Sequence, residues 1–173
     1  MAKPGLKLRL AEVALFGMLG GLTFAAKEVT AFLPNIEPVS LLVMLFAVTF
    51  GRKALYPIYI FVLLELVLYG FGLWTIDYLY IWLVLAVAAW LLRNMSHPLA
   101  WALLSGVFGL SFGALCTPVC LLIGDWAFAV SWWISGIPFD IAHCAGNFVI
   151  ALVLFVPLRK LLGNLYHTMQ TKL

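Results

Sequence analysis

The sequence predicts an all-α, polytopic membrane protein with six transmembrane helices, forming a single domain over residues 1–173. Three observations predict this fold. Of the 173 residues, 65% are hydrophobic and only 10% are charged, whereas soluble domains have about 45–50% apolar and about 25% charged residues. The apolar residues form long runs. Charged residues, glycine and proline separate these runs. We therefore expect one helical membrane domain and no separate soluble domain.

A spanning helix needs about 20 mainly apolar residues, and most of the runs approach this length. The first run follows a basic start, as in a signal peptide, but it lacks a convincing cleavage site, so we expect a retained helix. The second run, residues 38–51, is short and would cross only with a tilt or with protein cover. Pro98 and Pro138 suit the first positions of the fifth and sixth helices. The predicted helices are residues 6–26, 38–51, 53–71, 75–92, 98–122 and 137–161.

Lys and Arg predict the orientation of these helices, because cytoplasmic loops carry an excess of both. If the amino terminus is cytoplasmic, nine of the ten basic residues fall inside and only Lys27 falls outside. The nine are Lys3, Lys7, Arg9, Arg52, Lys53, Arg93, Arg159, Lys160 and Lys172. Both termini are therefore expected in the cytoplasm. The outer loops, near residues 27–37, 70–76 and 123–137, are then acidic and aromatic.

Three polar residues share one face of the sixth predicted helix. Asp140, His143 and Asn147 follow one another at helical spacings of three and four residues. Pro138 would place Asp140 at the start of this helix, where the helix dipole favours a carboxylate. Polar groups in a spanning helix must face protein or water. The trio predicts either a binding pocket or interhelical hydrogen bonds, with Asn147 paired to a backbone carbonyl or to Ser111.

Other polar and aromatic residues fall in the same outer half. Glu65 lies about 18 Å above the cytoplasmic end of its helix and either binds a ligand or pairs with His143. Asp77 opens the fourth helix, where it either lines a pocket or serves as a helix-start charge. Trp126 and Trp133 lie in one outer loop and would suit stacking on a flat ligand. We find no matching polar site on the cytoplasmic side, which is unusual for a transporter that works alone.

Small residues recur at every fourth position of the first predicted helix. Gly17, Gly21 and Ala25 form this stripe, and Ala14 lies close by. Such a stripe allows another helix to approach closely. The approaching helix belongs either to this chain or to a partner protein.

Several function classes lack their sequence signals. The chain has no GxSxG, HExxH or phosphate-binding glycine-rich motif, so we do not expect an enzyme. The basic residues form small groups and do not follow one face, which argues against nucleic-acid binding. Cys116, Cys120 and Cys144 lie in apolar segments without a second Cys/His cluster. We therefore expect no metal and no cofactor in this chain.

Three stretches carry a resemblance to a known family. They are LPNIEPVSLLVMLFAVTFG at the second predicted helix, SGVFGLSFGAL in the fifth and GIPFDIAHCAGNF at the sixth. Over nearly its full length the chain resembles the substrate-binding S component of energy-coupling factor (ECF) transporters, which import vitamins into bacteria. The resemblance implies a multi-pass protein of the bacterial plasma membrane that captures a vitamin from outside. A transmembrane T subunit and two cytoplasmic ATPase subunits, which use ATP, would complete the transporter.

The resemblance also implies which residues bind what. Family ligands are held by the outer halves of the later helices and by the loop between the first two. The corresponding positions are Glu37, Glu65, Trp74, Asp77, Trp126, Trp133, Asp140, His143 and Asn147. The family contacts its T subunit through a small-residue stripe on the first helix, here Ala14, Gly17, Gly21 and Ala25.

The ligand and the function each have alternatives. Cobalamin suits an aromatic and polar rim, and pyridoxine, pantothenate, riboflavin and a queuosine precursor are alternative ligands. A membrane assembly subunit that transports nothing and a stand-alone secondary transporter are alternative functions.

Overall fold

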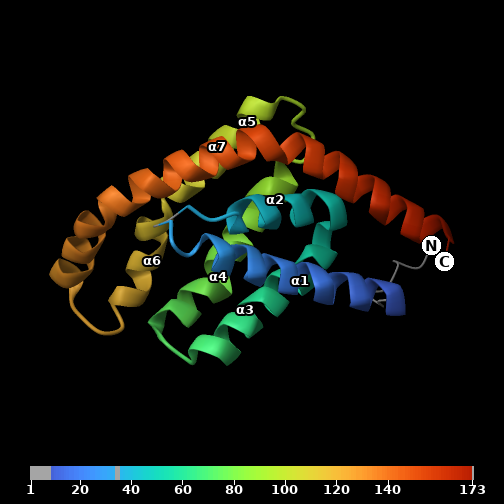
Figure 1. Ribbon diagram of the computed structural model, residues 1–173. Helices are drawn as coiled ribbons and strands as arrows, with labels where there is room; N and C mark the ends of the chain where they lie inside the picture. Colours follow the sequence, from blue (N-terminus) through green and yellow to red (C-terminus); the bar gives the residue numbers. More distant parts are fainter. Residues whose placement is uncertain (1–8, 34–35, 173) are drawn as a thin grey trace, which may run out of the picture.

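The computed structural model describes residues 9–33 and 36–172 (Figure 1). These residues form helices and contain no strand. The helices are α1 (Leu10–Thr30), α2 (Val39–Phe50), the short 3₁₀ helix η1 (Gly51–Ala54), α3 (Leu55–Tyr69), α4 (Leu73–Leu91), α5 (Pro98–Leu110), α6 (Phe112–Cys120) and α7 (Trp126–Lys172). Lys3, Lys7 and the beginning of the first predicted helix lie outside the described residues.

Five helical stretches are long and apolar enough to cross a membrane, as a multi-pass membrane protein requires. They are Leu10–Thr30, Val39–Tyr69, Leu73–Leu91, Pro98–Cys120 and Trp126–Thr171. The second stretch contains α2, η1 and α3, and the chain changes direction at Gly51. This residue has a φ of 57°, which glycine adopts without steric strain. In Figure 1 the chain runs along α2 to η1 and then back along α3.

Helix α2 is the central helix of the bundle. Nine of its 12 residues are buried. It packs against α4 and α7, while α1 packs along α3. A helix of 12 residues is about 18 Å long, which is shorter than the bilayer core of about 30 Å. Because neighbouring helices cover α2, this short helix does not have to present a full spanning length to lipid.

Helix α5 lies directly against α7. A Cβ atom on Gly109 would be 2.8 Å from the backbone carbonyl of His143, so only glycine allows the two backbones this close. Near the other end of α5, the rings of Trp101 and Phe155 stack with their centroids 4.2 Å apart. The helix is interrupted between α5 and α6 at Ser111, whose hydroxyl donates to the Val107 carbonyl. The fifth predicted helix is therefore two helices.

The prediction for the last helix was wrong at its start. The segment 123–137 was expected to be a loop, but α7 begins at Trp126 and is 47 residues long, about 70 Å at 1.5 Å per residue. Pro138 lies inside the helix and does not start it. A proline removes one helical hydrogen bond and can bend a helix without ending it. Figure 1 shows α7 crossing the whole molecule as one long helix.

The beginning of α1 and the end of α7 meet at Glu12. The Glu12 carboxylate is 1% exposed. The Tyr166 hydroxyl and the Gln170 amide donate to its Oε1 at 2.8 and 2.9 Å. The Lys53 ammonium donates to both carboxylate oxygens, at 2.7 and 2.8 Å. We call these four residues the Glu12 cluster, and it ties α1, η1 and α7 together at one end of the bundle.

Candidate ligand-binding site

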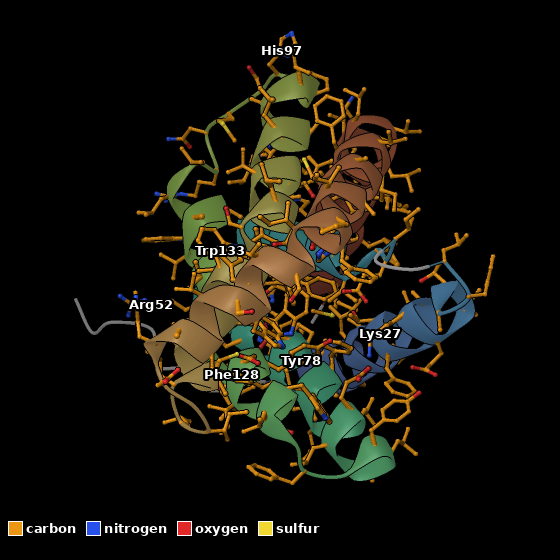
Figure 2. The ribbon with its side chains drawn as sticks, turned by 90° about the vertical axis from the view of Figure 1, so that its left-hand side faces the viewer. Lys27, Arg52, Tyr78, His97, Phe128 and Trp133 are labelled. Carbon is orange, nitrogen blue, oxygen red and sulfur yellow. The ribbon has the colours of Figure 1, made fainter. Side chains whose placement is uncertain are left out.

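Two neighbouring cavities lie at the other end of the bundle. The main cavity has a volume of about 330 Å³ and is lined by Lys27, Glu28, Thr30, Ala31, Leu33, Ile36, Glu37, Tyr69, Tyr78, Phe112 and His143. The side cavity has a volume of about 300 Å³ and is lined by Lys27, Glu65, Tyr69, Trp74 and Tyr78. The two cavities share Lys27, Tyr69 and Tyr78. Figure 2 shows Lys27 and Tyr78 close to each other.

Lys27 and Glu65 form an ion pair in the wall between these cavities. The Lys27 Nζ is 2.6 Å from Glu65 Oε2, and the Glu65 side chain is 2% exposed. The other carboxylate oxygen, Oε1, is buried and has no hydrogen-bond partner among the described residues. The predicted alternative, a pairing of Glu65 with His143, was wrong, because α1 and α3 pack together and bring Lys27 to Glu65 first.

His143 reaches the main cavity from α7. Its ring packs edge-on against Phe112, with the centroids 5.0 Å apart. The side chain is buried, and its Nε2 has no partner within the described part of the chain. A buried polar atom is costly unless it is hydrogen-bonded. His143 Nε2 is therefore available to a group inside the cavity.

Glu37 lies in the connection between α1 and α2 and lines the main cavity. Removal from water raises the pKa of Glu37 from its ordinary value of 4.5 to about 7. The positive charge of Lys27 opposes this rise and the negative charge of Glu65 adds to it. The carboxyl group of Glu37 therefore changes charge near neutral pH.

The raised pKa of Glu37 predicts how stability depends on pH. The folded protein binds the Glu37 proton more tightly than the unfolded chain does, so this residue favours folding at low pH. Its contribution is lost as the pH rises from about 4.5 to about 7. We expect Glu37→Gln to flatten the fall in the thermal midpoint over this range, measured in one detergent for both proteins. Parallel pH profiles would contradict this assignment.

Asp140 does not line either cavity. Its Oδ1 accepts a hydrogen bond of 3.0 Å from the backbone N–H of Gly113, in the first turn of α6. The expectation that Asp140 sits at the start of its own helix was wrong, because α7 begins at Trp126. The carboxylate instead lies at the N-terminal end of α6, where the partial positive charge of a helix favours it. A Cβ atom on Gly113 would be 2.5 Å from Asp140 Oδ2, so any larger residue at this position would displace the carboxylate.

Asn147 also lies outside the lining of both cavities. Its amide nitrogen donates to the Ser40 hydroxyl at 3.0 Å and to the Ser105 carbonyl at 3.4 Å. These contacts join α7 to α2 and α5. The sequence suggested a backbone carbonyl or Ser111 as the partner of Asn147. The carbonyl is that of Ser105, and the hydroxyl partner is Ser40 and not Ser111.

Three other predicted site residues lie away from the two cavities. Asp77 is buried. The Tyr80 hydroxyl lies within hydrogen-bond distance of both Asp77 Oδ1, at 3.0 Å, and the Leu115 carbonyl of α6. Trp126 and Trp133 are exposed on α7. Figure 2 shows Trp133 apart from Lys27 and Tyr78. The structure thus brings four of the nine predicted residues to the cavities, namely Glu37, Glu65, Trp74 and His143.

The nine predicted positions do not include Lys27, Tyr69, Tyr78 or Phe112, which line the cavities. One signal for Lys27 was present, since it is the single basic residue expected on the outer side. A signal for Tyr69 was its position one helical turn after Glu65. Tyr78 and Phe112 are aromatic residues among many others, and their sequence positions alone do not distinguish them.

The described residues contain no group of three His, Cys, Asp or Glu side chains that could hold a metal ion. The site is therefore defined by aromatic rings, carboxylates, one lysine and one histidine. No protein-family model, curated protein or solved structure matches this chain.

Proposed function

We propose that this protein is a membrane-embedded, substrate-binding S component of an ECF-type importer in the bacterial plasma membrane. The observation that carries the proposal is the main cavity, beside which His143 Nε2 is buried without a partner. Pockets that bind small molecules combine apolar and aromatic walls with a few polar groups. In this proposal the protein captures its ligand from outside and catalyses no reaction. A T subunit and two ATPase subunits, which hydrolyse ATP, deliver the ligand.

The proposal includes six spans with both termini in the cytoplasm. Support for six spans comes from the opposite directions of α2 and α3, which make two crossings of the Val39–Tyr69 stretch. Support for termini on one side comes from the Glu12 cluster, in which α1 and α7 meet. Lys53 of the same cluster follows the positive-inside rule if this end is cytoplasmic. The two cavities then face the outside.

The cavity volume favours a small ligand. Neither cavity exceeds about 330 Å³, at the lower end of the range of about 300–1,000 Å³ for small-molecule pockets. A corrin ring with its nucleotide arm is much larger than any of the other candidate ligands. Among the ligands suggested by the family resemblance, we therefore place pyridoxine, pantothenate, riboflavin and a queuosine precursor ahead of cobalamin.

A thermal-shift screen of the purified protein against these vitamins tests the proposal. A ligand that binds only the folded state at about 100 times its dissociation constant is expected to raise the midpoint by roughly 5–10 °C. The shift should disappear in His143→Ala. It should persist in Trp133→Ala, because Trp133 does not line the cavities.

Two results would count against the importer proposal. A membrane assembly subunit would bind none of the vitamins, although His143→Ala would still lower its stability. Uptake driven by an ion gradient, without T subunit or ATPases, would indicate a secondary transporter.

The small-residue stripe on α1 is the proposed contact with the T subunit. Ala14, Gly17 and Ala25 are exposed and Gly21 is half-buried. A Cβ atom on Gly17 or Gly21 would have no neighbouring atom within 4 Å. The stripe is thus open to another helix. Contact within the chain is made instead by Gly20, where a Cβ atom would be 2.5 Å from the Ile60 side chain.

This arrangement predicts the effect of Gly17→Leu. We expect the variant to fold and to bind ligand as the wild type does, because a Cβ atom on Gly17 would meet no described atom within 4 Å. Association with the T subunit should fall at least tenfold, since a leucine would separate the two helix backbones. Co-purification with the partner subunits measures this loss. Normal assembly of Gly17→Leu would mean that the T subunit binds elsewhere.

A further inference from the structure

Two ion pairs among the described residues each contain a buried glutamate and are alike in geometry. Lys27 and Glu65 are 2.6 Å apart, and Lys53 and Glu12 are 2.7 Å apart. The lysine side chains are 22% and 26% exposed, and the glutamates are 2% and 1% exposed. Their surroundings differ in every other respect, and the difference indicates what each pair does.

The carboxylate of Glu12 is fully occupied by its own chain. Its Oε1 accepts hydrogen bonds from Lys53, Tyr166 and Gln170. Its Oε2 accepts from Lys53 and from the backbone N–H of Arg9. A buried carboxylate satisfied in this way is a structural junction between helices.

The carboxylate of Glu65 is only half occupied. Its Oε2 is paired with Lys27, and its Oε1 is buried without a partner in the described ranges. An unsatisfied buried oxygen costs free energy, which a partner inside the cavity would recover. Glu65 also lines the side cavity, so this carboxylate lies in the cavity wall.

Two tyrosine rings complete the surroundings of the Lys27 ammonium. Its Nζ lies 5.6 Å from the centre of the Tyr69 ring and 5.8 Å from the centre of the Tyr78 ring. Both distances are within the range of about 6 Å for cation–π attraction. Aromatic rings around a carboxylate are a common way to bind organic cations. We call Glu65, Tyr69 and Tyr78 the cation cage.

The charge of the cavity walls also favours a cation. Glu28, Glu37 and Glu65 line the two cavities, and Lys27 is the one Lys or Arg among the lining residues of either. Glu28 is engaged by the Tyr69 hydroxyl, whereas Glu37 has no hydrogen bond from any described residue to its carboxylate. A further positive charge placed here would be attracted by unpaired carboxylate oxygens.

We infer that the cation cage binds a positively charged nitrogen of the transported ligand, and that Lys27 competes with the ligand for this position. This inference rests on the proposed function, which supplies the transport. It narrows the ligand to organic cations and so removes pantothenate, an anion, and riboflavin, which is neutral, from the candidate vitamins. Lys27 lies in the wall between the two cavities. Its withdrawal would therefore free the cage and join both cavities into one larger site.

Chemical rescue tests the cage directly. In Lys27→Ala the cage keeps its carboxylate and both rings but loses its cation. Methylammonium chloride is the probe, with potassium chloride at equal concentration as the salt control. At about ten times its dissociation constant, methylammonium is expected to raise the thermal midpoint of Lys27→Ala by about 3–6 °C over potassium. The rise should saturate with concentration.

Three proteins serve as controls. The wild type should not respond, because Lys27 already fills the cage. Lys27→Ala/Glu65→Gln should not respond, because the carboxylate is gone. Lys53→Ala, the matched ion pair, should respond less than Lys27→Ala, because Glu12 keeps three neutral donors and no described aromatic ring lies at cation–π distance from Lys53. An equal response in Lys27→Ala and the double variant, or no response in Lys27→Ala, would overturn the inference.

A second variant covers the case in which Lys27→Ala does not fold. Lys27→Gln keeps a hydrogen-bond donor near Glu65 Oε2, and its midpoint should respond to methylammonium in the same way. If both variants unfold during purification, methylammonium in the buffers should recover folded protein, and failure to do so would overturn the inference. Rescue without any shift in the vitamin screen would retain the cation cage and reject the vitamin-importer proposal.

Discussion

Lys53→Ala is expected to lower the free energy of unfolding by about 3–5 kcal/mol, the range for removing one partner of a buried ion pair. The variant leaves the Glu12 carboxylate, which is 1% exposed, without its only cationic partner among the described residues. The remaining donors, Tyr166, Gln170 and the Arg9 N–H, are neutral. Reversible unfolding in mixed micelles, followed by helix content, measures the change.

Arg52→Ala is the matched control for this experiment. Arg52 precedes Lys53 in η1 and carries the same charge, but it is exposed and its side chain forms no hydrogen bond or ion pair with any described residue. Its removal should change stability by less than about 0.5 kcal/mol. Lys53→Ala/Glu12→Gln should recover part of the lost stability, because no buried charge is left unpaired. If Lys53→Ala and Arg52→Ala cost the same, the Glu12 cluster does not stabilise the fold as described.

Gly109→Ala is expected to lower the free energy of unfolding by about 1–3 kcal/mol, as other overpacked sites do. The new methyl group would lie 2.8 Å from the backbone carbonyl of His143 and 2.9 Å from the backbone nitrogen of Cys144. Backbone atoms cannot rotate away as a side chain can, so α5 and α7 must separate. Unfolding in mixed micelles should show the lower stability. Binding of the screened ligand should weaken as well, since His143 lines the main cavity.

Gly163→Ala is the control within the same pair of experiments. Gly163 is also helical, and a Cβ atom there would have no neighbour within 4 Å. Replacing such a glycine by alanine should stabilise the helix by roughly 0.5–1 kcal/mol. A loss of stability in Gly163→Ala equal to that in Gly109→Ala would show that close packing does not explain the loss at Gly109, because a Cβ atom on Gly163 meets no neighbour.

The sequence was sufficient to predict the helices but not all of their ends. Apolar runs locate the helical segments because burial in lipid or protein requires them. The beginning of α7 was missed because Gly136 and Pro138 are ordinary signals for the start of a helix. Pro138 does not interrupt α7, because a single proline removes only one hydrogen bond and the residues before it already form regular helical turns.

The candidate site was partly predictable for a similar reason. Charged residues inside apolar runs, such as Glu65 and His143, are conspicuous in the sequence. Their partners are not, because the rotation of each helix about its axis is set by packing with its neighbours. Asp140 illustrates this limit, since its partner, the Gly113 N–H, lies 27 residues earlier in the chain.

Because of its length, α7 contributes residues to both ends of the bundle. His143 at the main cavity and Tyr166 at the Glu12 cluster lie 23 positions apart on this helix, about 35 Å along its axis. A rotation of α7 near His143 would also move Tyr166 unless the helix bends between these two residues. Pro157 is the proline in that interval. The stiffness of the helix around Pro157 therefore determines how much of a displacement at the main cavity is transmitted to the Glu12 cluster.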